Sequence, residues 1–338
     1  TFMVTSSPSP TPNSCRILEV FDLKNATAVA GANLLVDFMI NVLQIHEHLG
    51  GISFSKAHWS TYTLVNEIET LLCAYALGYE RIFHIEELES DPLLCRKLGV
   101  QKLPDTTTLY RNLERFNSED RVNELCRLNR RLLEHILRGQ KIAILDIDTT
   151  VETVFGQQEG SCIGYNARYH GRASFQPFLA FEGLSQAAVH ARLRSGQKPS
   201  SDDVIAFIQE SKANLPSGVK LAYVRGDRGM TSERVCAYLE SKGVSYTLKL
   251  KMPSTLYSRI FRGVLWRRLP NDDDSIVIEV GSVMFRAKSW LKHRRVVLVR
   301  TRPAFEQQQK LFDEYSWHYE AIVTDLDWDP EDIWHFYH

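Results

Sequence analysis

Hydrophobic positions in the first part of the chain recur with the spacing of helices. Between residues 16 and 140, apolar side chains return every three or four positions, as at Leu64, Ile68 and Leu71. This spacing places them on one face of an α-helix, where they can enter a core. We therefore predict a helical domain over residues 16–140. Residues 1–15 are rich in Ser, Thr and Pro, which predicts a disordered leader.

The pattern changes at Lys141. The run KIAILDID that starts there has the length and the β-branched content of a buried strand. Strand-like and helix-like segments then alternate as far as Leu250, which predicts an α/β domain with a mixed sheet and helices on its faces. From residue 253 to 323 nearly all of the signals are strand-like, which predicts a β-rich insertion. The second domain is therefore expected to run over residues 141–338.

The composition is that of a globular protein. The chain has 338 residues, of which 44% are hydrophobic, and a formal net charge of -1, values that exclude collagen-like and disordered chains. No run of apolar residues is long enough to span a membrane, so we expect a soluble, cytoplasmic protein with no membrane partner. The six cysteines form no CxxC pair, which argues against zinc ribbons and redox motifs.

The small net charge hides a segregation of charge near the C-terminus. Between Ser241 and Phe305 there are 14 Lys and Arg residues against four acids, whereas nine acids face a single lysine from Glu306 to His338. The basic segment predicts a surface that follows DNA phosphates, and a solvated face of a sheet remains the alternative. The candidate phosphate contacts are Arg259, Arg262, Arg267, Arg268, Arg294 and Arg295, with Trp266 and Trp290 as stacking or packing partners.

Three aspartates are the candidates for chemistry. Asp146 and Asp148 lie two positions apart on one predicted strand and share a face, and Asp227 follows a second predicted strand. Open α/β sheets place reactive groups at such strand ends. Carboxylates that lie close together repel each other, and Mg²⁺, or Mn²⁺ as an alternative, relieves that repulsion. The competing interpretation for each aspartate is a turn residue that binds nearby backbone.

Several short motifs stand in a defined order along the chain. They are LPDTTTL at 103–109, DTT at 148–150, QEG at 158–160, GYN at 164–166 and RGDRG at 225–229. As a set they resemble the DDE transposases of bacterial insertion sequences, and the resemblance covers residues 60–338.

The resemblance implies an RNase H-like catalytic core in which a β-rich insertion separates the second catalytic Asp from a helix with a catalytic Glu. Asp148 would be the first metal-binding acid and Asp227 the second, with Asp146 as the second choice for the first position. Tyr337 matches the Tyr of the last family motif. The Glu of that motif would then lie beyond His338, so the resemblance implies a C-terminally truncated catalytic domain without its third carboxylate.

The resemblance also implies a function. A DDE transposase uses Mg²⁺ to cleave DNA at the ends of an element and then transfers the cut strand. Its partners would be the terminal inverted repeats, the target DNA and a second copy of the chain, and we expect it in the cytoplasm, associated with the nucleoid. The helical domain would bind DNA. A catalytically inactive DNA-binding remnant and a structure-specific RNase H-like nuclease are the alternatives.

Overall fold

The protein forms two compact units, residues 1–128 and residues 129–338, which are called the first and second unit below. The computed structural model describes residues 3–4, 17–18, 27, 29–52, 56–261, 263–270, 275–304 and 317–338. Most of the predicted leader and the candidate Arg262 lie outside these residues.

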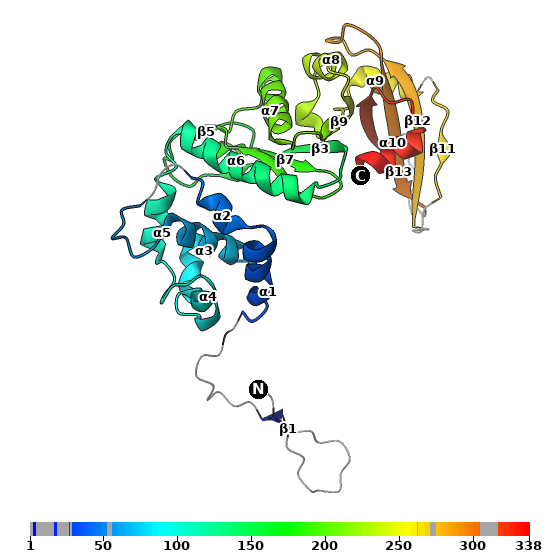
Figure 1. Cartoon of the computed structure of the whole chain (residues 1–338). Coiled ribbons are helices and arrows are strands. Elements are labelled where there is room, and N and C mark those ends of the chain that lie inside the picture. Colours follow the sequence, from blue (N-terminus) through cyan, green and yellow to red (C-terminus); the bar gives the residue numbers. More distant parts are fainter. Residues whose placement is uncertain are drawn as a thin grey trace, which may run out of the picture. The chain divides into compact units, whose positions relative to one another are not determined.

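Helices make up most of the first unit (Figure 1). Thr63, Asp91 and Asp105 each cap a helix by accepting hydrogen bonds from backbone N–H groups of its first turn. The elements are β1 (Met3–Val4), β2 (Ile17–Leu18), α1 (Ala32–Asp37), the π-helix η1 (Phe38–Val42), α2 (Ile45–Leu49), α3 (Leu64–Ala76), the 3₁₀-helix η2 (Ile82–Leu88), α4 (Pro92–Lys97), α5 (Thr106–Leu113) and α6 (Glu119–Ile136).

The boundary between the units lies inside α6, between Leu128 and Asn129, and not at residue 140 as predicted. The reason is the packing of the C-terminal part of this helix. Leu133 and Leu137 are buried in the core of the second unit, so this part of α6 belongs to that core. The periodicity of the sequence identifies the helix but not the core that each part of it enters.

Within the described residues, nine strands of the second unit form one mixed sheet in the order β11-β12-β13-β14-β10-β9-β3-β7-β8. The strands β3, β9 and β10 run parallel, and the other pairs are antiparallel, which confirms the predicted RNase H-like α/β class. The strands are β3 (Ile142–Thr149), β7 (Phe178–Glu182), β8 (Ala188–Arg192), β9 (Lys220–Gly226), β10 (Ser245–Lys249), β11 (Arg267–Arg268), β12 (Ile276–Phe285), β13 (Arg294–Pro303) and β14 (His318–Thr324).

The remaining elements of the second unit are a small side sheet and several helices. The side sheet consists of β4 (Glu152–Thr153), β5 (Cys162–Ile163) and β6 (Ala173–Phe175). The helices are α7 (Ser201–Asn214), the 3₁₀-helix η3 (Arg228–Met230), α8 (Glu233–Ser241), α9 (Ser254–Phe261) and α10 (Pro330–Tyr337). Figure 1 shows α7 and α8 side by side, in agreement with their packing contacts.

Alternation along β3 separates a core face from a polar face. Ala143, Leu145 and Ile147 enter the main core together with residues of α6, α7 and α8. Because side chains of a strand alternate between its two faces, Asp146 and Asp148 lie on the opposite face. The core thus fixes β3 and leaves these two aspartates outside it.

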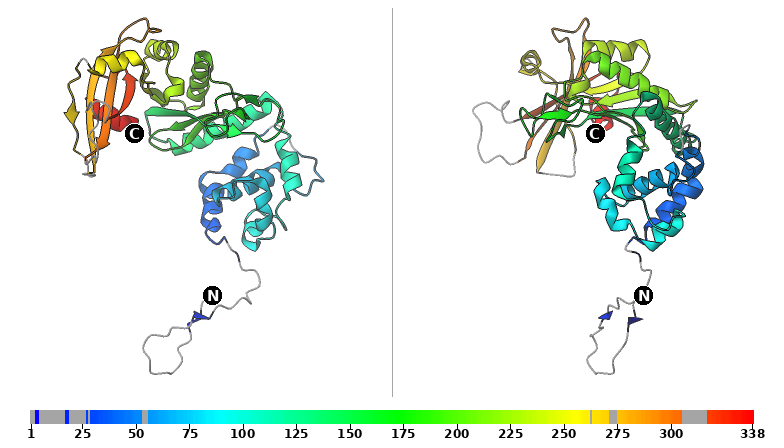
Figure 2. Two further views of the ribbon diagram at one scale, coloured as in Figure 1. Left: turned by 180° about the vertical axis from the view of Figure 1, so that it is seen from behind. Right: turned by 90° about the vertical axis from the view of Figure 1, so that its left-hand side faces the viewer.

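The predicted β-rich insertion extends the main sheet beyond β10. Strand β14 pairs antiparallel with β10, and β13 and β12 follow it outward (Figure 2). Helix α10 comes after β14 and packs against β12 and β13. The segment after β10 therefore adds strands to the edge of the sheet, and α10 follows them. None of the helices among the described residues combines the length and apolar character needed to cross a membrane.

Candidate active site

Asp148 and Asp227 stand at the ends of two neighbouring parallel strands. The last paired residues of β3 and β9 are Ile147 and Gly226, and each aspartate directly follows one of them. Neighbouring strands lie about 4.8 Å apart, so the register brings the two carboxylates to the same edge of the sheet. Both residues are exposed, and neither forms an ion pair with another described residue.

A cleft of about 470 Å³ opens at this edge of the sheet. Its floor comes from β3 and β9, and part of its wall comes from the C-terminal end of α10. The lining residues are Asp146, Ile147, Asp148, Phe181, Arg225, Gly226, Asp227, Tyr337 and His338. All three of the candidate acids and the Tyr that matches the family motif therefore line one cleft.

Tyr337 lies half-buried in the lining of this cleft. Burial, reinforced by the negative charges of Asp227, Glu320 and Asp148, raises the pKa of Tyr337 to about 12. The hydroxyl is therefore protonated at neutral pH and can donate a hydrogen bond to an anionic oxygen in the cleft.

Asp146, the second-choice metal ligand, is engaged in an ion pair. Its two carboxylate oxygens each accept a hydrogen bond of 2.5 Å from Arg225, one from Nε and one from Nη2. A carboxylate held by both oxygens in this way is a poor ligand for a cation, because the guanidinium already neutralises it. This pairing favours Asp148 over Asp146 as the first metal-binding acid, and both roles stay predictions. Arg225 lies in the RGDRG motif, but no pattern of the sequence predicts its contact with Asp146.

Asp148 and Asp227 fit a hard divalent cation by their chemistry. Such cations prefer carboxylate oxygens, and both carboxylates carry negative charge that no neighbouring cation of the described structure neutralises. Among the described residues no group of three or more His, Cys, Asp or Glu side chains is arranged to hold a metal ion.

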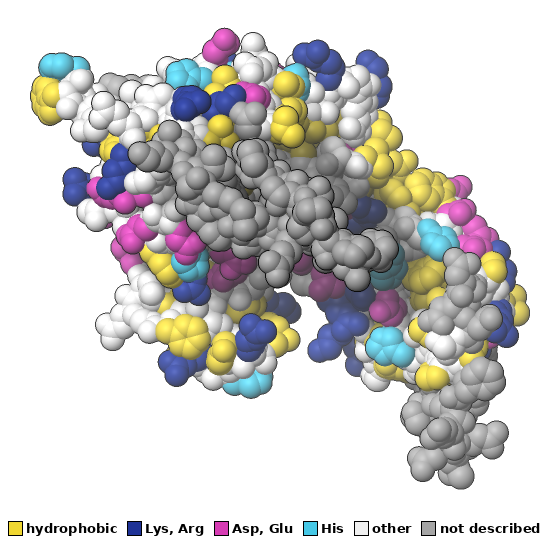
Figure 3. Space-filling view, turned by 90° about the horizontal axis from the view of Figure 1, so that it is seen from below, with side chains coloured by type: hydrophobic (Ala, Val, Ile, Leu, Met, Phe, Trp, Pro, Cys, Tyr) yellow, Lys and Arg dark blue, Asp and Glu magenta, His cyan; other side chains and the backbone are white. Residues whose placement is uncertain are grey.

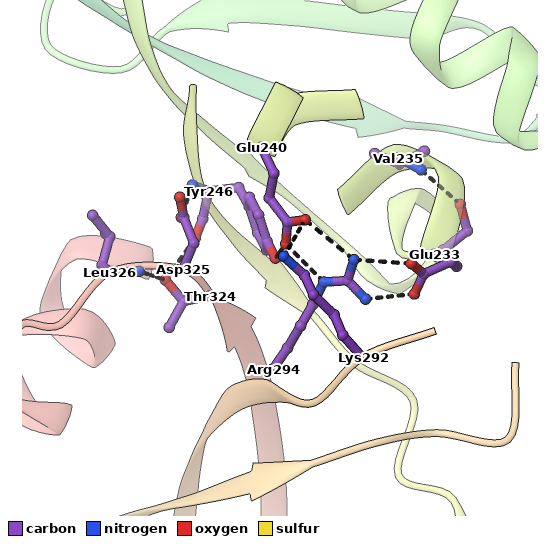
Figure 4. A network of polar contacts seen from close by, with 10 residues as sticks. Glu233, Val235, Glu240, Tyr246, Lys292, Arg294, Thr324, Asp325 and Leu326 are labelled. Atoms are coloured by element: carbon purple, nitrogen blue, oxygen red, sulfur yellow. Dashed lines mark hydrogen bonds and ion pairs between the residues drawn. The ribbon is translucent and has the colours of Figure 1, made fainter. Parts of the chain in front are cut away.

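The structure corrects the predicted phosphate contact at Arg294. This side chain is only 2% exposed, and its guanidinium is bound by Glu233 and Glu240 (Figure 4). Trp290, expected as a stacking or packing partner, is buried in the core with the Arg294 guanidinium carbon 5.4 Å from its ring centre. Arg294 therefore holds β13 to α8 and is not available to DNA.

The other candidate arginines divide into bound and exposed ones. Arg295 donates to the backbone oxygens of Leu326 and Trp328 at 2.9 and 2.6 Å, and Arg267 pairs with Asp329 and Glu331. Arg259 on α9 and Arg268 on β11 are exposed, and no ion pair links either to another described residue. These two remain as candidates.

Figure 3 shows a face of the protein on which charges of both signs lie side by side. Lys and Arg side chains lie among acidic and hydrophobic ones over the visible face. The count of basic residues along the sequence therefore overstates the basic surface, because several of the arginines neutralise acids of the same unit.

Comparison with known proteins gives a family match. The profile described as transposase DDE domain group 1 matches residues 11–338. A search of the curated proteins gives no match.

Solved structures of transposases are similar to parts of the chain. A cryo-EM structure of a piggyBac transposase synaptic complex with hairpin DNA matches with 10% identity and a TM-score of 0.39, over 88% of this chain and 61% of that chain. A Mos1 strand transfer complex matches with 11% identity and a TM-score of 0.22, over 64% of this chain and 70% of that chain. A pre-cleavage Mos1 transpososome matches with 10% identity and a TM-score of 0.19, over 64% of this chain and 71% of that chain. The chain thus spans less than two thirds of the piggyBac transposase chain.

Proposed function

The chain belongs to the DDE transposase family, and from this premise we propose that Asp148 and Asp227 bind a divalent metal ion and that the protein cleaves and joins DNA. The observation that carries the proposal is the position of these two carboxylates, neither in an ion pair with another described residue, at the ends of neighbouring parallel strands in one open cleft. The proposed ion is Mg²⁺ or Mn²⁺, both of which accept oxygen ligands.

The residues of the cleft have separate roles in this proposal. Asp148 and Asp227 hold the cation, which when bound supplies positive charge to a phosphate and lowers the pKa of a bound water. Tyr337, protonated at neutral pH, donates a hydrogen bond that orients an anionic oxygen of the DNA backbone. The cleft is open to solvent on the side of both aspartates, as an extended polymer substrate requires.

Duplex DNA is the proposed partner, as terminal inverted repeats and as target. The first unit is the proposed reader of the repeats, and Arg259 and Arg268 of the second unit are the proposed phosphate contacts. We further propose that two copies of the protein act together on two DNA ends. A nucleoid-associated protein in the cytoplasm fits this proposal.

Isosteric removal of each carboxylate charge in the full-length protein tests the proposed site. Asp148→Asn and Asp227→Asn should each lower the rate of metal-dependent cleavage of DNA that carries the element ends by more than ~100-fold. Loss of a residue that only supports a metal ligand costs up to about 100-fold, and loss of the ligand itself should cost more. Asp202→Asn is the matched control, because Asp202 is an exposed aspartate in a surface ion pair with Arg234. The measurement is the cleavage rate at several Mg²⁺ and Mn²⁺ concentrations.

The outcomes separate the competing functions. Cleavage at the wild-type rate by both variants contradicts the assignment of the two acids. DNA binding by the wild-type protein without any cleavage favours an inactive DNA-binding remnant. Cleavage that is never followed by strand joining favours a structure-specific nuclease.

A further inference from the structure

Arg225 connects three elements that meet at the cleft. It lies on β9, two residues before Asp227, and binds both oxygens of Asp146 on β3. Its remaining terminal nitrogen, Nη1, donates a hydrogen bond of 2.5 Å to the backbone oxygen of Phe336 on α10. The guanidinium carbon also lies 5.2 Å from the centre of the Phe336 ring. One side chain thus contacts both strands that end in the candidate acids and the helix that carries Tyr337.

We propose that Arg225 is a positioning residue, which together with Asp146 holds the end of α10, and with it Tyr337, against the cleft of Asp148 and Asp227. This inference rests on the proposed function of the cleft. It assigns to Asp146 a role different from metal binding, because the carboxylate fixes the guanidinium, and the guanidinium fixes the helix.

The physical reason lies in the charge and shape of the guanidinium. Its Nη1 donates a charge-assisted hydrogen bond to the Phe336 oxygen, and such a bond is stronger than one between neutral groups. The planar fork of Arg can bind a carboxylate with two nitrogens and a carbonyl with a third, whereas a Lys ammonium cannot reproduce this arrangement.

The space around the pair is shaped for it. A Cβ atom at Gly183 would lie 2.8 Å from Arg225 Nη2 and 3.1 Å from Asp146 Oδ2, so any larger residue at this position would push the pair apart. The nearby buried carboxylate of Glu182 is already bound by the backbone N–H groups of Ile144, Leu184 and Ser185. Asp146 is therefore the carboxylate left for Arg225.

Hydrogen exchange on the metal-free, full-length protein tests directly whether Arg225 holds α10. In Arg225→Gln, the amide of His338, which is bonded to Trp334 within α10, should exchange about tenfold faster, because the helix loses a charge-assisted contact at Phe336. The amide of Ile333 should keep its protection, since the Ile333 side chain is buried and holds the start of α10. Arg234→Gln is the matched control, as it removes an arginine from an exposed ion pair of the same unit.

Kinetics distinguish positioning from general stabilisation. We expect Arg225→Gln and Asp146→Asn to lower kcat for cleavage by at least about tenfold while KM for DNA stays within about twofold, because small displacements of reacting groups cost rate more than binding. Arg225→Lys should recover part of the loss. It also serves as the second variant if Arg225→Gln fails to fold.

Two results would overturn the inference. One is unchanged exchange at His338 in both Arg225 variants. The other is a folded Arg225→Gln protein that cleaves DNA with the wild-type kcat and still loses cleavage when Asp148 is replaced. This result would leave the proposed function intact and would contradict only the positioning role of Arg225. A wild-type protein that cleaves no DNA would instead contradict the proposed function, and the exchange experiment would still decide whether Arg225 holds α10.

Discussion

Arg294 is a fixed charge inside the second unit, and its neighbours show what it does there. Its guanidinium lies between the carboxylates of Glu233 and Glu240, at 2.5 and 2.8 Å (Figure 4). Glu240 also accepts hydrogen bonds from Lys292 and Tyr246. A buried ion pair of this kind adds little when it is intact, but loss of one partner leaves an uncompensated charge that is expensive to bury.

Replacement of Arg294 by Ala should therefore lower the free energy of unfolding at pH 7 by about 3–5 kcal/mol. Urea unfolding measures this value, and Arg259→Ala is the control, because an exposed arginine on α9 should change it by no more than about 0.5 kcal/mol. Equal effects of the two variants would mean that the network contributes nothing specific.

The same network predicts an acid response. Burial alone would raise the pKa of Glu240, but hydrogen bonds from Arg294, Lys292 and Tyr246 lower it to about 2, from an ordinary value of 4.5. A pKa depressed in the folded state contributes stability above the unfolded pKa, and that stability is lost as the pH falls towards the folded pKa. The wild-type protein should therefore lose stability between pH ~5 and ~2, and Arg294→Ala should show a smaller loss over the same interval.

At the residue scale, the charge count of the sequence could not separate Arg294 from Arg259. A signal was nevertheless present. The residues after Arg294 and Arg295 read VVLV, a run of apolar residues typical of a strand buried on both faces. Val296 and Leu298 enter one core, and Val297 and Val299 enter the other, so both arginines begin a strand whose two faces are covered. The identities of their partners, which are carboxylates for Arg294 and backbone oxygens for Arg295, 31 to 61 residues away, depend on the fold and could not be read from periodicity.

At the element scale, the strand and helix positions around the candidate site were predictable because local signals determine them. The strand Ile142–Thr149 forms where the run KIAILDID predicts it, and α7 begins directly after Ser200, a residue type that caps helices. The common facing of Asp146 and Asp148 follows from the period of a strand. The contact of Arg225 with Phe336, 111 residues apart, requires the pairing of β9, β10 and β14, and no local pattern encodes it.

Gly164, which directly follows β5 of the side sheet, closely approaches Gly196, which comes after β8, and this gives a prediction for one element. A Cβ atom at Gly164 would lie 1.8 Å from the backbone oxygen of Gly196, so Gly164→Ala forces the two backbone segments apart. Overpacking of this kind costs about 1–3 kcal/mol, and contact with backbone places the cost at the upper end. Thermal or urea unfolding measures it.

Gly229→Ala is the control for this substitution, since no atom would lie within 4 Å of its added Cβ. We expect it to leave stability nearly unchanged. A Gly164→Ala protein as stable as this control would show that the side sheet can move without cost.

At the scale of the whole molecule, the net charge of -1 results from many local pairs and says little about how DNA binds. Several basic side chains of the segment from Ser241 to Phe305 are bound within the second unit, among them Arg267, Arg294 and Arg300. Only exposed cations can release counterions from DNA when they contact phosphates. The expected electrostatic contribution is therefore smaller than the 14 basic residues of the segment would give.

Replacement of both Arg259 and Arg268 by Ala should weaken binding to related and unrelated duplexes alike. Each phosphate contact contributes about -0.9 to the slope of log affinity against log salt concentration, so the loss of both should flatten the slope by about one to two units. The control removes the exposed cations Lys198 and Lys212, which changes the net charge by the same amount at other positions of the second unit. Titrations at several salt concentrations compare the two double variants. The same flattening in both would mean that net charge alone sets the slope, and an unchanged slope with intact affinity would place Arg259 and Arg268 on a face that only solvent contacts.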